Sequence, residues 1–407
     1  MTAGLADCTP FHSLAGGLMM ASSLHTLLSK SGMVLGISGF FHSTVSSTLG
    51  AIKGDPSASQ SSIFPLAARY FTAGILTGGV ILGLSRNWVE AGLGVSILDD
   101  VTNVHRASLL KLAGLGAMVG FGTKLGNGCT SGHFLCGLSR LSLRSLVATA
   151  TFFGVAVATR VTTTAPSATS SAAIKTTFAS HLPSMFPQPD FGTLLVLQAP
   201  AIIYRSVPGL LGAIDPSAPP QENRSYQLIA ARIMAFFVGI HFSFALAVSG
   251  MMRPTKVLGF LSLSPELISS GAWDPSLAMV AIGGIIPASI AYFREVKPKQ
   301  DELRRRSAQS DSKRPAKLDT QLQPELSLVA PEWRTPANPS KIDLRLIGGS
   351  VLFGLGWGAT GLCPGPALTS LASLSVETVT RSSSSGVLDL FVFVASMAVG
   401  GQIASSL

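Results

Sequence analysis

Long apolar stretches separated by short polar breaks run through most of this 407-residue chain. Several of them reach about 20 residues, the length at which a helix crosses the apolar part of a bilayer. Membrane-spanning helices are predicted over residues 10–28, 66–84, 109–125, 143–161, 228–248, 277–293, 344–362 and 387–403. The weakly apolar stretch 191–211 is interrupted by Pro200 and Pro208, which predicts a short or broken helix.

The polar breaks are of two kinds. Ser-Gly-Met occurs at 31–33 and again at 249–251, each time after an apolar stretch and before a short apolar piece. Longer segments (50–62, 162–190) are rich in small and polar residues and predict loops, and the mixed segment 86–105 predicts an interfacial element. Residues 294–341 are rich in charged residues, and their apolar residues recur at no regular spacing, so we expect this segment to be disordered. Its excess of Lys and Arg predicts a cytoplasmic position by the positive-inside rule.

Two glycine-rich elements that end in a cysteine stand out. Residues 120–140 read GFGTKLGNGCTSGHFLCGLSR, and residues 354–373 read GLGWGATGLCPGPALTSLAS. Placing Cys129 on Cys363 without a gap also aligns glycines at 120 and 122 with those at 354 and 356. Glycine inside a helix costs roughly 1 kcal/mol relative to alanine, so clusters this dense indicate broken helices and closely approaching backbones.

The order of elements is the same in both parts of the chain: span, Ser-Gly-Met break, short helix, span, glycine-rich helix, cysteine, short helix, span. We therefore predict two pseudo-repeated membrane halves, 1–161 and 224–407, joined by a linker over 162–223 that contains the broken helix. The polar loop 294–342 interrupts the second half. Broken helices from two repeats meet near the midplane in many transporters, although channels and membrane enzymes also duplicate.

Composition supports a membrane protein. The chain is 47% hydrophobic and only 12% charged, and its mean hydropathy is +0.46, whereas soluble domains carry about 25% charged residues. The net charge of +9 does not indicate nucleic-acid binding, because part of it lies in 294–341, with 11 Lys or Arg against 7 Asp or Glu. No basic n-region opens the sequence, so no signal peptide is predicted.

Few charged residues fall inside the predicted spans, and neither a carboxylate relay nor a phosphate-binding P-loop is visible. We therefore expect neither an enzyme nor a bound cofactor. The groups that remain as candidates for substrate binding are helix N-termini, hydroxyls and thiols. Thr130 and Pro364 open short helices directly after the two repeat cysteines, and such openings favour anions. Protonated thiols beside them suit a soft anion with a terminal sulfur.

The predicted substrate-binding residues are Cys129, Thr130, Ser131, Gly132, His133, Cys363, Pro364 and Gly365. His133 has two interpretations, as an anion ligand or as a residue that caps its helix and bonds a carbonyl. Cys129, His133 and Cys136 are spaced so that an α-helix would place them on one face, where they could bind a metal ion. Only three ligands are present, so a metal site is the weaker hypothesis.

The remaining cysteines and cations have ordinary interpretations. Cys8 and Cys136 are interpreted as small buried hydrophobic residues, because neither is one of the two cysteines that align in the repeat. Four cations lie near the mouths of the broken helices: Arg140, Arg144, Arg253 and Lys256. Each of them taken alone is interpreted as a charge at a helix end whose side chain reaches the membrane–water interface. Together, the four could attract anions.

Four segments resemble the YeeE/YedE family of sulfur transport proteins, whose studied members take up thiosulfate. They are GFGTKLGNGCTSGHFLCGLSRLS (120–142), SGMMRPTKVLGFL (249–261), WDPSLA (273–278) and GLGWGATGLCPGPAL (354–368). The chain resembles the bacterial two-protein form of this family fused into one polypeptide.

The resemblance implies an all-α membrane fold of about nine spans with short re-entrant helices. It also implies uptake of thiosulfate along cysteine thiols, a role that carries over to Cys129 and Cys363. A further central cysteine of the thiosulfate-transporting form has no counterpart in 31–39, which leaves a related sulfur anion as an alternative. The second hypothesis is a membrane sulfurtransferase or thiol redox protein with Cys129 as sulfur carrier. We expect a multi-pass protein of the plasma membrane. A soluble sulfur-carrier protein is a candidate partner.

Overall fold

The computed structural model describes residues 8–54, 63–99, 108–164, 186–210, 220–309, 322–335, 342–381 and 386–407. Within these ranges the chain is helical, and the sole β pairing is one bridge between Met33 and Arg334. The helices are α1 (Pro10–Ser31), α2 (Ile37–Ile52), α3 (Ile63–Leu84), α4 (Arg86–Leu93), α5 (Leu109–Leu125), the π-helix η4 (Thr130–Gly137), α6 (Leu143–Thr163), α7 (Phe191–Leu197), α8 (Ala199–Leu210), α9 (Pro220–Ser249), α10 (Pro254–Phe260), α11 (Pro265–Ser269), η5 (Pro275–Leu277), α12 (Ala278–Ala291), η6 (Tyr292–Val296), α13 (Lys297–Gln309), α14 (Leu344–Thr360), α15 (Pro364–Arg381) and α16 (Val387–Ser405).

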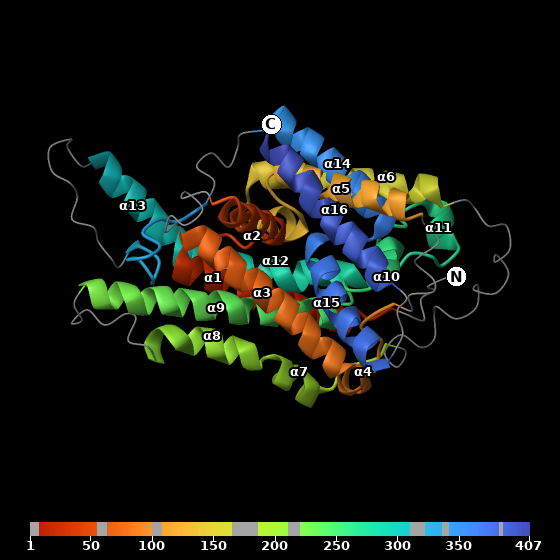
Figure 1. The fold of residues 1–407 in the computed structure, drawn as a ribbon, viewed down its shortest axis with the longest axis horizontal. Coiled ribbons are helices and arrows are strands. Elements are labelled where there is room, and N and C mark those ends of the chain that lie inside the picture. Colours follow the sequence, from red (N-terminus) through yellow and green to blue (C-terminus); the bar gives the residue numbers. More distant parts are fainter. Residues whose placement is uncertain are drawn as a thin grey trace.

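Most long helices run side by side along one direction of the molecule (Figure 1). Seven helical stretches of the described residues are long and apolar enough to cross a membrane. α1 and α5 lie beside them in the same bundle, packed on α9 and α12 and on α14 and α16. The prediction of an all-α, multi-pass membrane protein is therefore confirmed. The broken helix predicted over 191–211 is present as α7 and α8, which are separated at Gln198.

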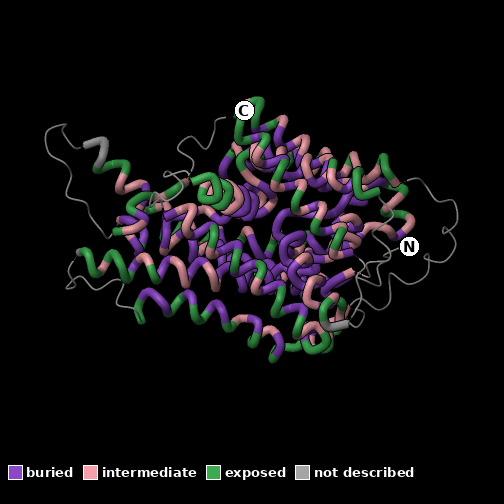
Figure 2. The backbone as a smooth tube through the Cα atoms, viewed as in Figure 1, coloured by how far each residue is buried: buried purple, intermediate pink, exposed green. Residues whose placement is uncertain are grey.

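Matched helix pairs build the bundle. α3 packs on α9 and α1 on α12, while α5 packs on α16 and α6 on α14. Under the sequence repeat, each of these contacts has its counterpart between equivalent helices. The centre of the bundle is buried, and the exposed residues lie at helix ends and on the outer faces of the helices (Figure 2). Glycines permit the close packing, because a Cβ added to Gly120 would lie 1.9 Å from the Met397 carbonyl oxygen. The boundaries proposed for the two halves and the linker stay a prediction.

Four breaks bring helix starts into the middle of the bundle. The breaks follow α1, α5, α9 and α14, and each contains one residue with positive φ: Gly32, Asn127, Gly250 and Gly361. α2, η4, α10 and α15 then begin within a few residues. The starts of α2 and η4 touch, since the Ile37 backbone N–H donates to the Ser131 hydroxyl at 3.0 Å. The starts of α10 and α15 are also close, because a Cβ on Gly361 would lie 2.6 Å from the Pro254 carbonyl oxygen.

The prediction that 294–341 is disordered is wrong for the part that the structure describes. α12 continues through η6 into α13, which is stabilised by i,i+4 ion pairs such as that between Lys297 and Asp301. Residues 322–335, called the strap below, pack against the bundle with Leu326 fully buried. Backbone hydrogen bonds from Leu326 to Lys30 and from Arg334 to Gly32 hold the strap on the end of α1. Backbone hydrogen bonds and the burial of Leu326 thus order a polar segment that has no regular apolar pattern.

Some predicted segments lie outside the described residues. They include 55–62 of the first predicted loop, 100–105 of the interfacial segment, most of the loop 162–190, and 310–321 and 336–341 of the charged stretch. The described part of the segment predicted as interfacial forms α4 and a short non-helical stretch, 94–99.

Candidate functional site

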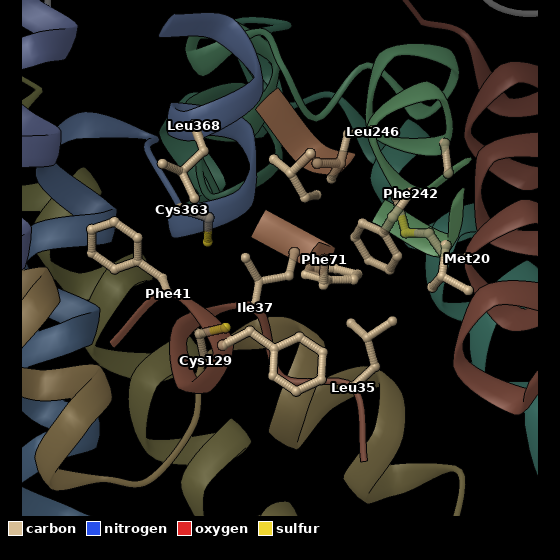
Figure 3. Close-up of a cluster of buried hydrophobic side chains, with 14 of the residues drawn as sticks. Met20, Leu35, Ile37, Phe41, Phe71, Cys129, Phe242, Leu246, Cys363 and Leu368 are labelled. Atoms are coloured by element: carbon tan, nitrogen blue, oxygen red, sulfur yellow. The ribbon is translucent and has the colours of Figure 1, made fainter. Parts of the chain in front are cut away.

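The two repeat cysteines line one cavity of about 370 Å³ in the middle of the bundle. Cys129 directly precedes η4 and Cys363 directly precedes α15, and each is only 2% exposed. The Thr130 hydroxyl oxygen lies 3.5 Å from the Cys363 sulfur. Figure 3 shows both sulfurs in this region, with Ile37 beside them. The structure therefore joins two elements that are 233 residues apart at a space that we call the cysteine cavity.

The local backbone explains why Cys129 reaches this cavity. It is the N-cap residue of η4 and has an extended conformation, with φ −124° and ψ −163°. Its sulfur lies 3.3 Å from the Ser131 hydroxyl. That hydroxyl also accepts the hydrogen bond from the Ile37 backbone at the start of α2. Ser131 thus couples the start of α2 to the position of the Cys129 thiol.

Six of the eight predicted site residues line the cysteine cavity. They are Cys129, Thr130, Ser131, Cys363, Pro364 and Gly365. Gly132 and His133 instead line a second cavity of about 410 Å³, called the arginine cavity because its lining includes Arg140, Arg144 and Arg334. The prediction thus selected residues that face two adjacent spaces.

The neck between the two cavities consists of Gly36, Ile37, Ser131 and Gly132, because Ile37 and Ser131 line the first and the two glycines line the second. A Cβ added to Gly36 would lie 3.9 Å from the Gly132 Cα atom, an ordinary contact distance. With glycine at both positions the two backbones pass each other without side chains. The start of α2 and the first turn of η4 therefore separate the two cavities.

His133 has a partner for each ring nitrogen. Its Nε2 lies 3.1 Å from the Gly126 carbonyl oxygen, to which it donates, and its Nδ1 lies 3.2 Å from the Ser145 hydroxyl. The side chain is buried. These contacts favour the interpretation in which His133 holds the turn before η4 over direct anion binding.

Aliphatic and aromatic side chains form most of the remaining wall of the cysteine cavity, among them Phe153, Phe242 and Trp357. Thr149 on α6 is an exception that sequence reasoning missed. Its hydroxyl oxygen is buried and has no hydrogen-bond partner among the described residues. A lone threonine in an apolar span carries no sequence signal, so only the packing of α6 against the cavity identifies it.

The other two cysteines lie elsewhere. Cys136 donates its thiol hydrogen to the Leu35 carbonyl oxygen at 3.1 Å and does not line the cysteine cavity. The α-helical spacing expected for Cys129, His133 and Cys136 fails because η4 is a π-helix, whose turns are wider. No group of three potential metal ligands occurs among the described residues. Cys8 receives a hydrogen bond from the Ser276 hydroxyl at 3.2 Å.

The four candidate cations divide into two pairs. Arg140 and Arg144 line the arginine cavity. Arg253 pairs with Asp99 at 2.9 Å, and the buried Lys256 pairs with Asp274 at 3.0 Å. Asp274 also accepts a hydrogen bond from the Ser276 backbone N–H, which makes it the N-cap of η5. Of the four cations, Arg140 and Arg144 thus line a cavity, while Arg144, Arg253 and Lys256 each pair with a carboxylate.

Comparison with known proteins identifies relatives. Residues 230–308 and 321–406, which run from α9 to α16 and include the strap, match a family of unknown function, DUF6691. A probable transporter from Xylella fastidiosa strain Temecula1 is 33% identical over 170 residues, which cover 41% of this chain and 83% of the relative. The chain belongs to this family of probable transporters. A second probable transporter of that strain is 31% identical over 154 residues, or 37% of this chain and 93% of the relative.

Membership in this probable-transporter family supports transport and favours it over catalysis. It also fits the seven apolar helices of a multi-pass membrane protein. The names of these relatives specify no substrate, so the substrate class is inferred from the chemistry of the cysteine cavity and the arginine cavity.

Proposed function

We propose that this chain transports a small sulfur-containing inorganic anion across the plasma membrane, with thiosulfate as the best candidate. The observation that carries the proposal is the meeting of Cys129 and Cys363 at one cavity between the starts of two helices. The probable-transporter relatives supply the class of activity. The resemblance of the surrounding motifs to sulfur transport proteins supplies the substrate class.

The chemistry of the cavity suits a soft anion. A neutral thiol is polarisable and donates a weak hydrogen bond, which matches the diffuse charge of a terminal sulfur better than the compact charge of an oxygen. The first N–H groups of η4 and α15 have no partners within their own helices, and they lie where an anion would need donors. The apolar remainder of the wall disfavours strongly hydrated ions.

The route leads through the arginine cavity, the neck and the cysteine cavity in sequence. The arginine cavity lies beside the strap, on the side of the bundle that also carries the charged helix α13 (Figure 1). The excess of Lys and Arg in 294–341 supports a cytoplasmic position for this side, by the positive-inside rule. The cysteine cavity then forms the selective middle of the path.

The burial of Cys129 weighs against its use as a covalent sulfur carrier. Reactive cysteines are partly exposed in electropositive surroundings, whereas Cys129 is 2% exposed in a mostly apolar cavity. Passage of the anion by non-covalent contacts is the simpler function for a thiol in this place.

Uptake of labelled thiosulfate into cells that lack their own sulfur-anion transporters tests the proposal. Cells expressing this chain should accumulate label, and unlabelled thiosulfate should compete better than sulfate or phosphate. The matched control is the double variant Cys129→Ser, Cys363→Ser at equal membrane abundance. Well-expressed wild-type protein that takes up no sulfur anion from a panel of thiosulfate, sulfite and sulfide would refute the proposal.

A further inference from the structure

Three arginines line the arginine cavity. Arg140 and Arg144 reach it from the turn and helix that follow η4, and Arg334 reaches it from the strap. Among the described residues that line it there is no aspartate or glutamate. The polar groups beside the arginines include Asn127, Ser145 and Thr335. Arg144 also pairs with Asp343, which is not among the lining residues, at 3.5 Å, and the carboxylate partners of Arg253 and Lys256 are closer, at 2.9 and 3.0 Å.

The strap holds Arg334 in a defined place. The Arg334 backbone N–H donates to the Gly32 carbonyl oxygen at 2.8 Å, and its guanidinium carbon lies 5.7 Å from the centre of the Phe64 ring. The neighbouring Trp333 donates its indole N–H to the Leu322 carbonyl oxygen at 3.1 Å, which closes the strap on itself. The cation–π contact and the backbone bond orient the side chain along the cavity wall.

The other two arginines are also held at their bases. Arg140 donates through Nε to the Cys136 carbonyl oxygen at 2.9 Å, and Arg144 approaches Asp343 through Nη1 at 3.5 Å. A guanidinium has five N–H donors in a planar fork and can therefore bind more than one acceptor. Arginine forks match oxyanions such as sulfate, with two parallel hydrogen bonds each.

We propose that the arginine cavity is a binding site for a doubly charged oxyanion, and that Arg334 of the strap is one of its binding residues. The site holds the charged oxygens of the anion next to the neck, while the thiols beyond the neck contact its sulfur. This second part rests on the proposed function, whereas binding in the arginine cavity does not. The strap, in the second half, thereby completes a site whose other arginines belong to the first half.

Titration of inorganic sulfate into the purified full-length protein in detergent, followed by calorimetry at low and high salt, tests the site. Sulfate carries two charges and no terminal sulfur, so it probes the arginines without the thiols. We expect binding that weakens as salt rises, and a loss of about tenfold or more in affinity for Arg334→Gln and for Arg144→Gln. Using two variants from different elements guards against one of them failing to fold, which size-exclusion chromatography reports.

Arg345→Gln is the matched control, because Arg345 contacts the Leu407 carbonyl oxygen at the chain end and does not line the cavity. Its affinity for sulfate should stay within about twofold of wild type. Sulfate binding that is absent in wild type, unchanged in folded Arg334→Gln and Arg144→Gln, or equally reduced in Arg345→Gln would overturn the site.

The double variant Cys129→Ser, Cys363→Ser separates this proposal from the proposed function. It should bind sulfate like wild type, since the thiols lie beyond the neck. Loss of sulfate binding in that variant would contradict a separate arginine site. Normal thiosulfate uptake in it would instead refute the thiol path and leave the arginine site standing.

Discussion

The Thr130 hydroxyl oxygen and the Cys363 sulfur lie 3.5 Å apart, although 233 residues separate them in the chain. Thr130 directly follows Cys129, so this contact places the two repeat cysteines at the same cavity. It is a side-chain link between the starts of η4 and α15. The proposed path for a sulfur anion depends on this junction, and four of the following predictions examine it or its surroundings.

Cys129→Ser and Cys363→Ser should each reduce thiosulfate uptake to below roughly a tenth of wild type. A single neutral hydrogen bond contributes only about 0.5 to 1.5 kcal/mol to binding, but every transported ion must pass both thiols. Serine is a harder, more strongly hydrated donor than cysteine. Uptake is measured per membrane-embedded protein, with Cys8→Ser as control, because Cys8 lies beside Ser276 and outside the cavity. Wild-type uptake in either repeat-cysteine variant would exclude a thiol path.

Cys136→Ser should transport at close to the wild-type rate. The Cys136 thiol donates to the Leu35 carbonyl oxygen, and a serine hydroxyl can donate to the same acceptor. The comparison with Cys129→Ser is informative because Cys129 is the N-cap residue of η4 and Cys136 lies within the same helix. A strong loss of uptake in folded Cys136→Ser would mean that the path follows η4 along its whole length.

Thr130→Val should lower uptake by roughly two- to tenfold, since it removes one neutral hydrogen bond at the Cys363 sulfur and keeps the shape of the side chain. Thr130→Ser keeps the hydroxyl and should retain most of the activity. The initial uptake rate at saturating thiosulfate distinguishes the two variants. Equal rates for valine and serine would show that the hydroxyl has no part in transport.

Gly132→Ala should fold but transport more slowly. The added Cβ would lie 3.8 Å from the Gly36 Cα atom, which the backbone tolerates, yet it narrows the neck. Gly120→Ala is the contrasting variant, because its Cβ would lie 1.9 Å from the Met397 carbonyl oxygen and must disturb the packing of α5 on α16. Size-exclusion profiles and uptake rates together should separate a narrowed path from a damaged fold. Unchanged uptake in Gly132→Ala would remove the neck from the route.

Lys256→Met should destabilise the protein by about 3 to 5 kcal/mol, because it leaves the Asp274 carboxylate buried without its cation. Lys297→Met is the control, since the Lys297–Asp301 pair is about half exposed at 45% and 44% and such pairs contribute little. Thermal unfolding of the detergent-solubilised protein measures both. A Lys256→Met midpoint equal to that of the control would contradict a stabilising role for this ion pair.

The sequence by itself determined the helical membrane class and most helix positions. Apolar length reports how a segment partitions between water and lipid, a local property, and the span predicted at 109–125 coincides with α5. Glycine density likewise indicated close helix packing, as the Gly120 contact with Met397 bears out. The helix break after α1 was readable because its positive φ at Gly32 suits glycine.

Only the tertiary structure decided which of these local features act together. The meeting of Thr130 with Cys363 and the partners of His133 depend on packing between distant segments. The π-helical turn of η4 separates Cys136 from Cys129, although α-helical spacing would align them. The strap has no regular apolar pattern, so its order and the place of Arg334 come from hydrogen bonds to the end of α1 and from the burial of Leu326. Such contacts stabilise a segment only after the fold has brought both partners together, and local sequence pattern does not encode them.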